Sequence, residues 1–412
     1  MTANVLDALR ALPTETNSWA DIRSKDLLYV DKTELILDLV SNHKRAFIAR
    51  PQGFGKTLLN SILTELFRHG DQSFEGTTIY GKWNRPLGTK VISCNFSGPA
   101  QTTASGLTAL ICKRLVEACR QAGFTEDVCK QLSLPITFEG FFRQLKAVTR
   151  EESLMFLIDD WDYHLLVSLT VGWQFKGLAK VLRQFFAEFE TLDNVEFALV
   201  TGTLRYSGGC PWAGDERYDQ TLSSHYATLL GYTESELERY FTAYAQATLQ
   251  RKDELTEDFC TLREYYGGYC FDEQAETKLY SSHEINAFYA QLWESDEELN
   301  FKFFWCTNPS PNHDLVALIA KHKPTDSTIQ RYWDGDTWFS RAQLAACSTY
   351  DQLSFDQLML QLGYLRIIAR EDDSKSRGPR YVCGLANGEI GDIIEYALDL
   401  YDEGYRHYIQ CD

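Results

Sequence analysis

The segment that most constrains the fold lies at residues 47–63 and reads FIARPQGFGKTLLNSIL. A short apolar run precedes its two glycines, and Gly-Lys-Thr is followed by apolar residues at helical spacing. A polyphosphate needs backbone N–H groups that converge on its oxygens, a helix N-terminus behind them and a cation beside them. A loop between a buried strand and a helix supplies all three, so the segment predicts a phosphate-binding loop within an α/β fold.

Each residue of this loop has an expected role. Gly53 and Gly55 let the backbone approach the phosphates, Lys56 neutralises the β- and γ-phosphates, and Thr57 offers its hydroxyl to Mg²⁺. The start of the loop is unusual, because Arg50 replaces the expected first glycine and the proline after it favours extended geometry. The residues expected to bind the nucleotide are Arg50, Pro51, Gly53, Phe54, Gly55, Lys56 and Thr57.

A second motif follows about 100 residues later in LMFLIDDWD. Asp159 and Asp160 stand at the carboxyl end of a strongly apolar strand, where P-loop enzymes hold Mg²⁺ and polarise the attacking water. We expect Asp159 to serve the metal and Asp160 the water, with Asp162 as a further candidate for either task. Adjacent like charges beside a core are costly unless a cation lies there, which favours the functional interpretation.

A third motif, VEFALVTGTLRYS, ends another buried strand with polar residues. Thr201 at its tip is expected to contact the γ-phosphate, and Arg205 just beyond it to stabilise charge during phosphoryl transfer.

The alternation of strands and amphipathic helices predicts a parallel sheet with helices on both faces over residues 1–210. Residues 211–227 are polar and turn-rich, and helical patterns dominate residues 228–325, the expected lid subdomain. From residue 330 to 412, two short helices, a strand, a charged hairpin and a terminal helix suggest a winged-helix-like module.

Composition limits the partners. The 412 residues carry a formal net charge of -18, which disfavours broad nucleic-acid binding. No apolar run is long enough to span a membrane and the N-terminus does not read as a secretory signal. The 11 cysteines include no C-x-x-C pair, the usage expected of a cytoplasmic protein.

With these motifs in order, the chain resembles the bacterial AAA-ATPase-like family of P-loop proteins, within the wider STAND-like group. YVDKTELILDLV at residues 29–40, the Arg-Pro-x-x-Phe-Gly-Lys-Thr loop, LIDDWD, VTGTLRYS, LLGYTESELERYF and YYGGYCF carry the resemblance over about residues 20–395. The resemblance implies that the loop is a family variant rather than a decayed site, and that ATP and Mg²⁺ are the cofactors.

The chain departs from the family in two respects. Asp160 replaces the usual glutamate, which shortens its reach toward a water by about 1.5 Å. Many members continue into a restriction-type nuclease domain, and no Asp…Glu-x-Lys cluster follows residue 390, so any nuclease is expected on another chain.

These features support an ATP-hydrolysing switch that acts on a protein partner. Two alternatives stay open: a nucleotide-binding adaptor without catalysis, and a nucleic-acid-binding regulator that uses the C-terminal module. The sequence decides neither ATP against GTP nor the oligomeric state, and a homo-oligomer remains an option because a neighbouring subunit would then offer an arginine in place of Arg205.

Overall fold

The computed structural model describes residues 9–134, 136–248, 255–294, 301–305, 315–372 and 378–405. Its central element is a parallel sheet of four strands in the order β1-β4-β3-β2. The strands are β1 (Arg45–Ala49), β2 (Lys90–Asn95), β3 (Leu154–Asp159) and β4 (Val195–Gly202). Strand β3 is buried along its whole length, which explains its continuous apolar sequence. The expected α/β fold with a parallel sheet is confirmed.

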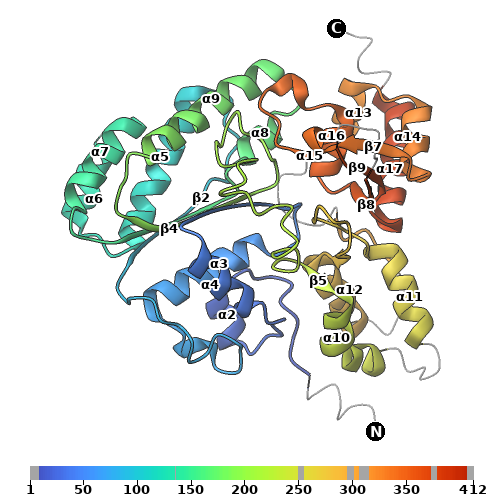
Figure 1. Cartoon of the computed structure of the whole chain (residues 1–412), viewed down its shortest axis with the longest axis horizontal. Coiled ribbons are helices and arrows are strands. Elements are labelled where there is room, and N and C mark those ends of the chain that lie inside the picture. The colour runs from blue at the N-terminus through green and yellow to red at the C-terminus, as the bar shows by residue number, and fades with distance from the viewer. Residues whose placement is uncertain are drawn as a thin grey trace.

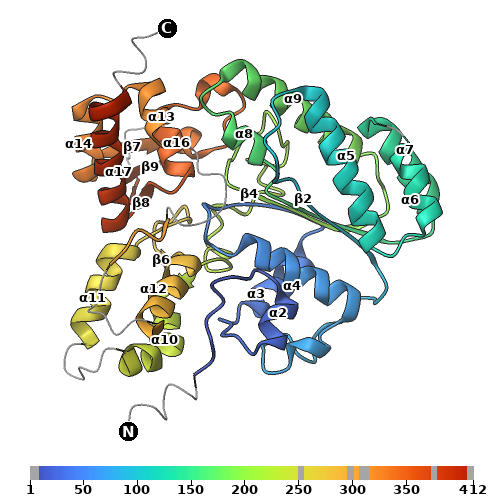
Figure 2. The ribbon, with the colours of Figure 1, turned by 180° about the vertical axis from the view of Figure 1, so that it is seen from behind.

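Helices cover both faces of this sheet (Figures 1 and 2). One face carries α2 (Trp19–Ser24), α3 (Thr33–Asn42) and α4 (Lys56–His69). The other carries α5 (Ala104–Gln121), α6 (Glu126–Ser133), α7 (Phe138–Val148), α8 (Tyr163–Val167) and α9 (Gly172–Phe189). A short 3₁₀ turn (Gln72–Phe74) follows α4. The core between these layers is continuous and rich in phenylalanine, so the sheet is a rigid platform for its loops.

A helical subdomain with its own core follows the sheet. It is closed by a two-stranded antiparallel ribbon of β5 (Tyr232–Thr233) and β6 (Leu279–Tyr280). Its helices are α10 (Glu234–Thr248), α11 (Leu255–Tyr266) and α12 (Ser282–Glu294). The Thr233 hydroxyl accepts from the Glu236 N–H at 3.3 Å and the Glu236 carboxylate accepts from the Thr233 N–H at 2.8 Å, which fixes the start of α10.

The last unit packs helices around a three-stranded antiparallel sheet in the order β7-β9-β8. Its elements are α13 (Leu315–His322), α14 (Asp326–Trp333), β7 (Thr337–Ser340), α15 (Arg341–Leu344), a 3₁₀ turn (Tyr350–Gln352), α16 (Phe355–Gln361), β8 (Leu365–Glu371), β9 (Arg380–Leu385), α17 (Gly388–Leu400) and a final π-helical turn (Tyr401–Tyr405). Residues 373–377 of the expected charged hairpin lie outside the described residues.

Within the described residues, no helix combines the length and the apolar character that crossing a membrane requires.

Candidate nucleotide site

A cavity of about 480 Å³ lies beside the phosphate-binding loop. Four parts of the chain line it: an N-terminal segment, the loop with the start of α4, the carboxyl ends of β2 and β3, and the helical subdomain. The lining residues include Thr14, Glu15, Tyr29, Lys32, Gly53, Gly55, Lys56, Thr57, Asn95, Asp160, Gly231, Tyr232, Ser282, His283 and Asn286. The volume falls within the range of ligand pockets in proteins.

The loop turns on two glycines in left-handed conformations. Gly53 has φ 82° and Gly55, which precedes α4, has φ 92°. A side chain at either position would be strained, so the backbone itself requires glycine there. Lys56 begins α4, and its Nζ donates to the carbonyl oxygens of Arg50 and Pro51 at 2.8 Å each. Burial lowers the pKa of Lys56.

Phe54, between the two glycines, anchors the loop. Its side chain is buried, and its ring meets the rings of Tyr269 and Phe271 edge to face, with centroids 5.1 and 5.0 Å apart. Such aromatic pairs are favourable beyond the area they bury. Phe54 therefore ties the loop to the chain beyond the sheet, and it also contributes to the wall of the large cavity.

Asp159 is the centre of a hydrogen-bond network at the ends of three elements. Thr57 Oγ1, from the start of α4, donates to one carboxylate oxygen at 2.7 Å. Thr201 Oγ1, from the end of β4, donates to the other at 2.6 Å and accepts from Asn60 Nδ2 at 2.9 Å. Because β4 lies between β1 and β3, Thr201 is placed between the loop strand and the acidic strand. Burial and the neighbouring Asp160 raise the pKa of Asp159 to about 6.

Asp160 lies at the cavity wall, and its backbone has φ 48°. Asn95, at the end of β2, donates through Nδ2 to Asp160 at 3.1 Å and to Asp159 at 3.3 Å. The amide therefore bridges the two adjacent acids. Left-handed geometry is uncommon outside glycine, although Asp adopts it more readily than most residues. Such strain often accompanies function.

Asp162, the further candidate, has a different position. It is fully buried, and one carboxylate oxygen accepts the backbone N–H groups of Thr203, at 2.9 Å, and Leu204. Burial raises its pKa to about 6. Asp162 thus fixes the turn after β4 rather than lining the cavity.

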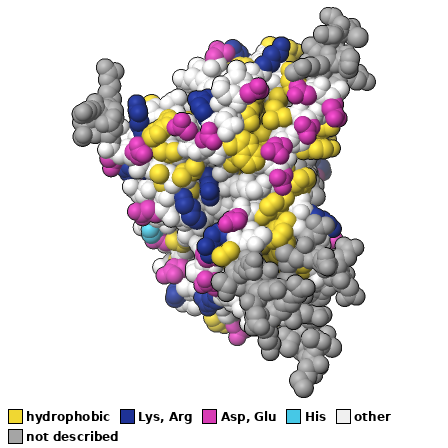
Figure 3. All heavy atoms as spheres, turned by 90° about the vertical axis from the view of Figure 1, so that its right-hand side faces the viewer, with side chains coloured by type: hydrophobic (Ala, Val, Ile, Leu, Met, Phe, Trp, Pro, Cys, Tyr) yellow, Lys and Arg dark blue, Asp and Glu magenta, His cyan; other side chains and the backbone are white. Residues whose placement is uncertain are grey.

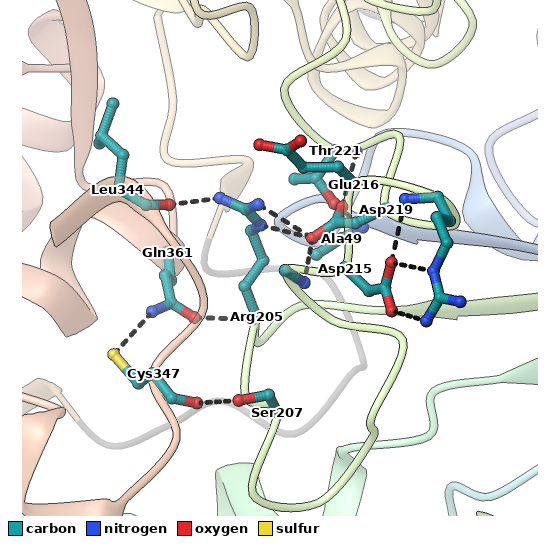
Figure 4. Close-up of polar contacts among 12 residues, drawn as sticks. Ala49, Arg205, Ser207, Asp215, Glu216, Asp219, Thr221, Leu344, Cys347 and Gln361 are labelled. Atoms are coloured by element: carbon teal, nitrogen blue, oxygen red, sulfur yellow. Dashed lines mark hydrogen bonds and ion pairs between the residues drawn. The ribbon is translucent and has the colours of Figure 1, made fainter. Parts of the chain in front are cut away.

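The two arginines expected at the site point elsewhere. Arg50 is buried, donates to the carbonyls of Ala49 (2.9 Å) and Thr221 (2.6 Å), and lies 4.5 Å from the Phe271 ring centroid. Arg205 pairs with Asp219 at 2.9 Å and donates to the Leu344 carbonyl (Figure 4). Both arginines, together with Pro51, line a smaller cavity of about 50 Å³ between the sheet and the C-terminal unit.

The helical subdomain contacts the loop directly. The carbonyl oxygen of Gly53 accepts from Ser282 Oγ at 2.8 Å and from the His283 N–H at 2.9 Å, both at the start of α12. On the other side of the cavity, Lys32 pairs with Glu236 at 2.6 Å, which ties the N-terminal segment to α10. The start of α12 therefore fixes the position of the phosphate-binding loop.

A comparison with known protein families matches the N-terminal part of the chain. Residues 13–208 match the family described as "AAA-ATPase_like: Predicted AAA-ATPase". This part of the chain is therefore similar to the AAA-ATPase-like family, and the match supports a nucleotide-binding ATPase domain.

Two further likenesses are weaker. The chain is 25% identical over 392 residues to an "Uncharacterized protein in vnfD 5'region" of Azotobacter chroococcum mcd 1, with 94% of this chain and 70% of that protein covered. The solved structure of the Aeropyrum pernix ORC2 protein (ADPNP-ADP complexes) aligns over 97% of both chains at 13% identity and a TM-score of 0.30. That score is too low to support a statement on fold or ligand.

The chemistry of the AAA-ATPase-like site suits a hard cation next to phosphate. Oxygens of Thr57, Asp159 and Asp160 converge beside the Lys56 ammonium, and oxygen donors are those that Mg²⁺ prefers.

Three residues of this site went unnoticed in the sequence. Asn95 ends the strand KVISCN, which lies next to the acidic strand. Its polar side chain at the carboxyl end of a buried strand was the sequence signal that could have identified it. Asn60 lies one turn after Lys56 on the same face of α4. Ser282 reaches the loop from more than 200 residues away, and no local pattern predicts such a contact.

Proposed function

We propose that this protein is a Mg²⁺-dependent ATP-hydrolysing switch that couples its nucleotide state to a protein partner. One observation carries the proposal: the network that joins Thr57, Asp159 and Thr201 beside Lys56, at the end of the 480 Å³ cavity. In this assignment Gly53, Gly55 and Lys56 hold the phosphates, and Thr57 and Asp159 hold the metal, which supplies charge neutralisation.

The chain's own groups then act on the attacking water. Asp160, at the cavity wall, orients the water and accepts its proton as the water oxygen bonds to the γ-phosphorus and the bond to the ADP oxygen breaks. Asn95 positions Asp160, and Thr201 contacts the γ-phosphate. We assign Arg205 no part in this chemistry, because its guanidinium pairs with Asp219 and donates to the Leu344 carbonyl.

The coupling runs through the segment that follows β4. Thr201 bonds to Asp159, and four residues later the Arg205 N–H donates to Gln361 Oε1 of α16 at 2.7 Å. The Cys347 N–H donates to the Arg205 carbonyl at 3.0 Å, and the Ser207 N–H donates to the Cys347 carbonyl at 2.8 Å. The Ser207 hydroxyl also donates to the Cys347 carbonyl, at 3.3 Å (Figure 4). If Thr201 moved toward a bound phosphate, the hydrogen bonds of this short segment would transmit the displacement to the C-terminal unit.

We propose further that residues 326–385 form a winged-helix-like module used for protein contact. The order helix, strand, two helices and a two-stranded wing supports this. Helix α16, which precedes the wing and corresponds to the element that reads DNA in such folds, is turned toward the ATPase domain. Its Gln361 binds Arg205, and Leu360 lines the small cavity. The net charge of -18 also favours a protein partner over nucleic acid.

The test is Mg²⁺-dependent binding and hydrolysis of ATP and GTP by the wild type, Lys56→Ala and Asp160→Asn. We expect Lys56→Ala to lose binding and Asp160→Asn to keep binding but lose turnover. Asp127→Asn, an exposed acid on α6, is the matched control and should behave as the wild type. Tight ATP binding with no turnover in any variant would contradict hydrolysis and support the adaptor alternative, which the short, Asn95-bound Asp160 favours.

A further inference from the structure

The outer side of the C-terminal unit exposes large apolar side chains. Trp333 of α14 is 44% exposed, Trp338 of β7 is 40% exposed and Tyr396 of α17 is 59% exposed. Ile368 and Leu400 are also exposed. We call these five residues the apolar face. Single exposed apolar residues are ordinary, but a cluster with two tryptophans and a tyrosine is typical of interaction surfaces.

Two members of the apolar face, Trp333 and Ile368, pack over glycines of neighbouring elements. The Trp333 ring lies so close to Gly391 of α17 that a Cβ there would come within 2.5 Å of it. Ile368 packs in the same way over Gly335 and Gly384. Tyr396 and Leu400 are one helical turn apart on the exposed side of α17. Glycines therefore leave room for Trp333 and Ile368 to pack closely on the unit.

Acidic side chains border the apolar face. Exposed Asp334 and Asp336 flank the tryptophans, and exposed Glu395 and Asp399 flank Tyr396 on α17. Figure 3 shows hydrophobic side chains gathered on this side of the molecule with Asp and Glu around them. Arg380 lies over the Trp338 ring at 5.8 Å, so a basic group already stacks on this face in the chain itself.

We propose that the apolar face binds a basic amphipathic helix of a partner protein, and that it is the surface through which the switch acts. This inference rests on the proposed function for its regulation, though not for its location. Apolar anchors on the partner would cover Trp333 and Tyr396, and Lys or Arg beside them would pair with the acidic border. A second copy of the chain fits poorly, because it would bring the same acidic border against this one.

The probe is a fluorescein-labelled amphipathic helical peptide of Leu and Lys, about 18 residues long. A scrambled peptide of the same composition is the control for general attraction to an acidic protein. Fluorescence anisotropy at physiological salt measures binding to the full chain and to two variants of the face, Trp333→Ser/Tyr396→Ser and Glu395→Lys/Asp399→Lys. The matched controls are Trp173→Ser, whose indole is 75% exposed on α9, and Glu151→Lys/Glu152→Lys, two exposed acids of the ATPase domain.

We expect both face variants to lower the affinity for the helical peptide about tenfold or more, and the control variants to leave this affinity unchanged. ATP turnover of every variant should match the wild type, which shows that each one folds. Equal affinity for the scrambled peptide, equal losses in the controls, or dimerisation that the face variants abolish would overturn the proposal. A gain in affinity on deleting residues 406–412 would assign the face to the chain's own end and also overturn it.

The nucleotide dependence separates this inference from the proposed function. Peptide affinity is measured with a non-hydrolysable ATP analogue and with ADP. A difference between the two states supports both proposals. Equal affinity in both states, with the variant pattern above, supports the surface and contradicts the switch.

Discussion

Asp159 and Glu284 are both buried carboxylates, yet their surroundings differ completely. Asp159, at the end of β3, accepts hydrogen bonds from Thr57, Thr201 and Asn95. Glu284, on α12 of the helical subdomain, has no hydrogen-bond partner for either carboxylate oxygen among the described residues. The first is prepared to carry a negative charge, and the second is not.

The surroundings of Glu284 explain how it is tolerated. It lies near Glu389 of α17, and burial together with Glu389 raises its pKa well above the usual range. Burial also raises the pKa of Glu389 to about 8, although one of its oxygens accepts the Trp305 N–H at 2.8 Å. Burial thus favours the protonated form of both carboxyls, and the pair belongs to the packing between the helical subdomain and α17.

The comparison of Asp159 with Glu284 shows which buried acids indicate a functional site. A carboxylate supplied with donors, beside a lysine and a cavity, is arranged for a cation or phosphate. A carboxylate without donors is kept neutral by its surroundings and contributes shape. The same residue type thus serves chemistry at one place and packing at the other, and the predictions below test that division.

The largest effect is expected from Asp159→Asn. The change keeps the size of the side chain and some of its hydrogen bonds to Thr57 and Thr201. It removes the negative charge that is proposed to bind Mg²⁺. We expect turnover to fall about 10²- to 10³-fold, equivalent to about 3–4 kcal/mol. Steady-state ATPase assays over a range of Mg²⁺ concentrations measure the turnover. The residual turnover of the variant should no longer depend on the Mg²⁺ concentration.

Glu284→Gln is the matched control for that prediction. Gln resembles the protonated carboxyl in shape, so turnover should stay within about twofold of the wild type. Equal losses in the two variants would contradict the division between a catalytic and a packing acid.

The second prediction concerns pH and the Glu389 pair. Because the pKa of Glu389 is about 8 in the folded protein and 4.5 in its ordinary range, its stabilising contribution is full below pH 4.5 and is lost as the pH rises to 8. The slope is about 1.4 kcal/mol per pH unit for a single group. Glu389→Gln removes this dependence and keeps an oxygen that accepts from Trp305. We expect the variant to be more stable than the wild type at pH 7, by on the order of 3 kcal/mol.

Chemical denaturation of both proteins between about pH 5 and about pH 8.5, with linear extrapolation to zero denaturant, measures the difference in unfolding free energy. The quantity of interest is the variant minus the wild type at each pH, because groups other than the neighbouring Glu284 titrate alike in both. A difference that does not grow with pH would show that Glu389 is charged in the folded protein.

The sequence predicted the loop, the acidic strand and Thr201 because each is local: a strand, a polar tip and a helix within a few residues. The structure brings Lys56, Thr57, Asp159 and Thr201 together as the order of the strands requires. The contacts that hold the Arg205 guanidinium could not be foreseen from such local patterns. Its position depends on Asp219 and on Leu344, which is 139 residues away in the chain. A pattern at one strand end cannot show which distant unit will pack there.

The third prediction therefore asks whether Arg205 belongs to the chemistry or to the junction. Asp219 is 2% exposed and its partner Arg205 13%, so Arg205→Ala leaves a buried charge without its partner. We expect a loss of stability of about 2 kcal/mol and a loss of turnover below about tenfold, measured by denaturation and ATPase assays. Asp219→Asn should resemble it. An arginine that stabilises the transferred phosphate would instead cost about 10³-fold in turnover with little change in stability.

The smallest effect, and the finest test of the site, is expected from Asp160→Glu. Asn95 bridges Asp160 and Asp159, and the shorter side chain at position 160 suits that bridge. A glutamate would reach about 1.5 Å further toward the phosphate but would crowd Asn95. If reach limits proton transfer, turnover rises a few-fold, and Asp160→Glu with Asn95→Ala rises further because the crowding is relieved. Single-turnover measurements with saturating ATP isolate this step from product release. A fall in both variants would show that the protein is built around the Asn95-bound aspartate, so that Asp160 acts by position and not by reach.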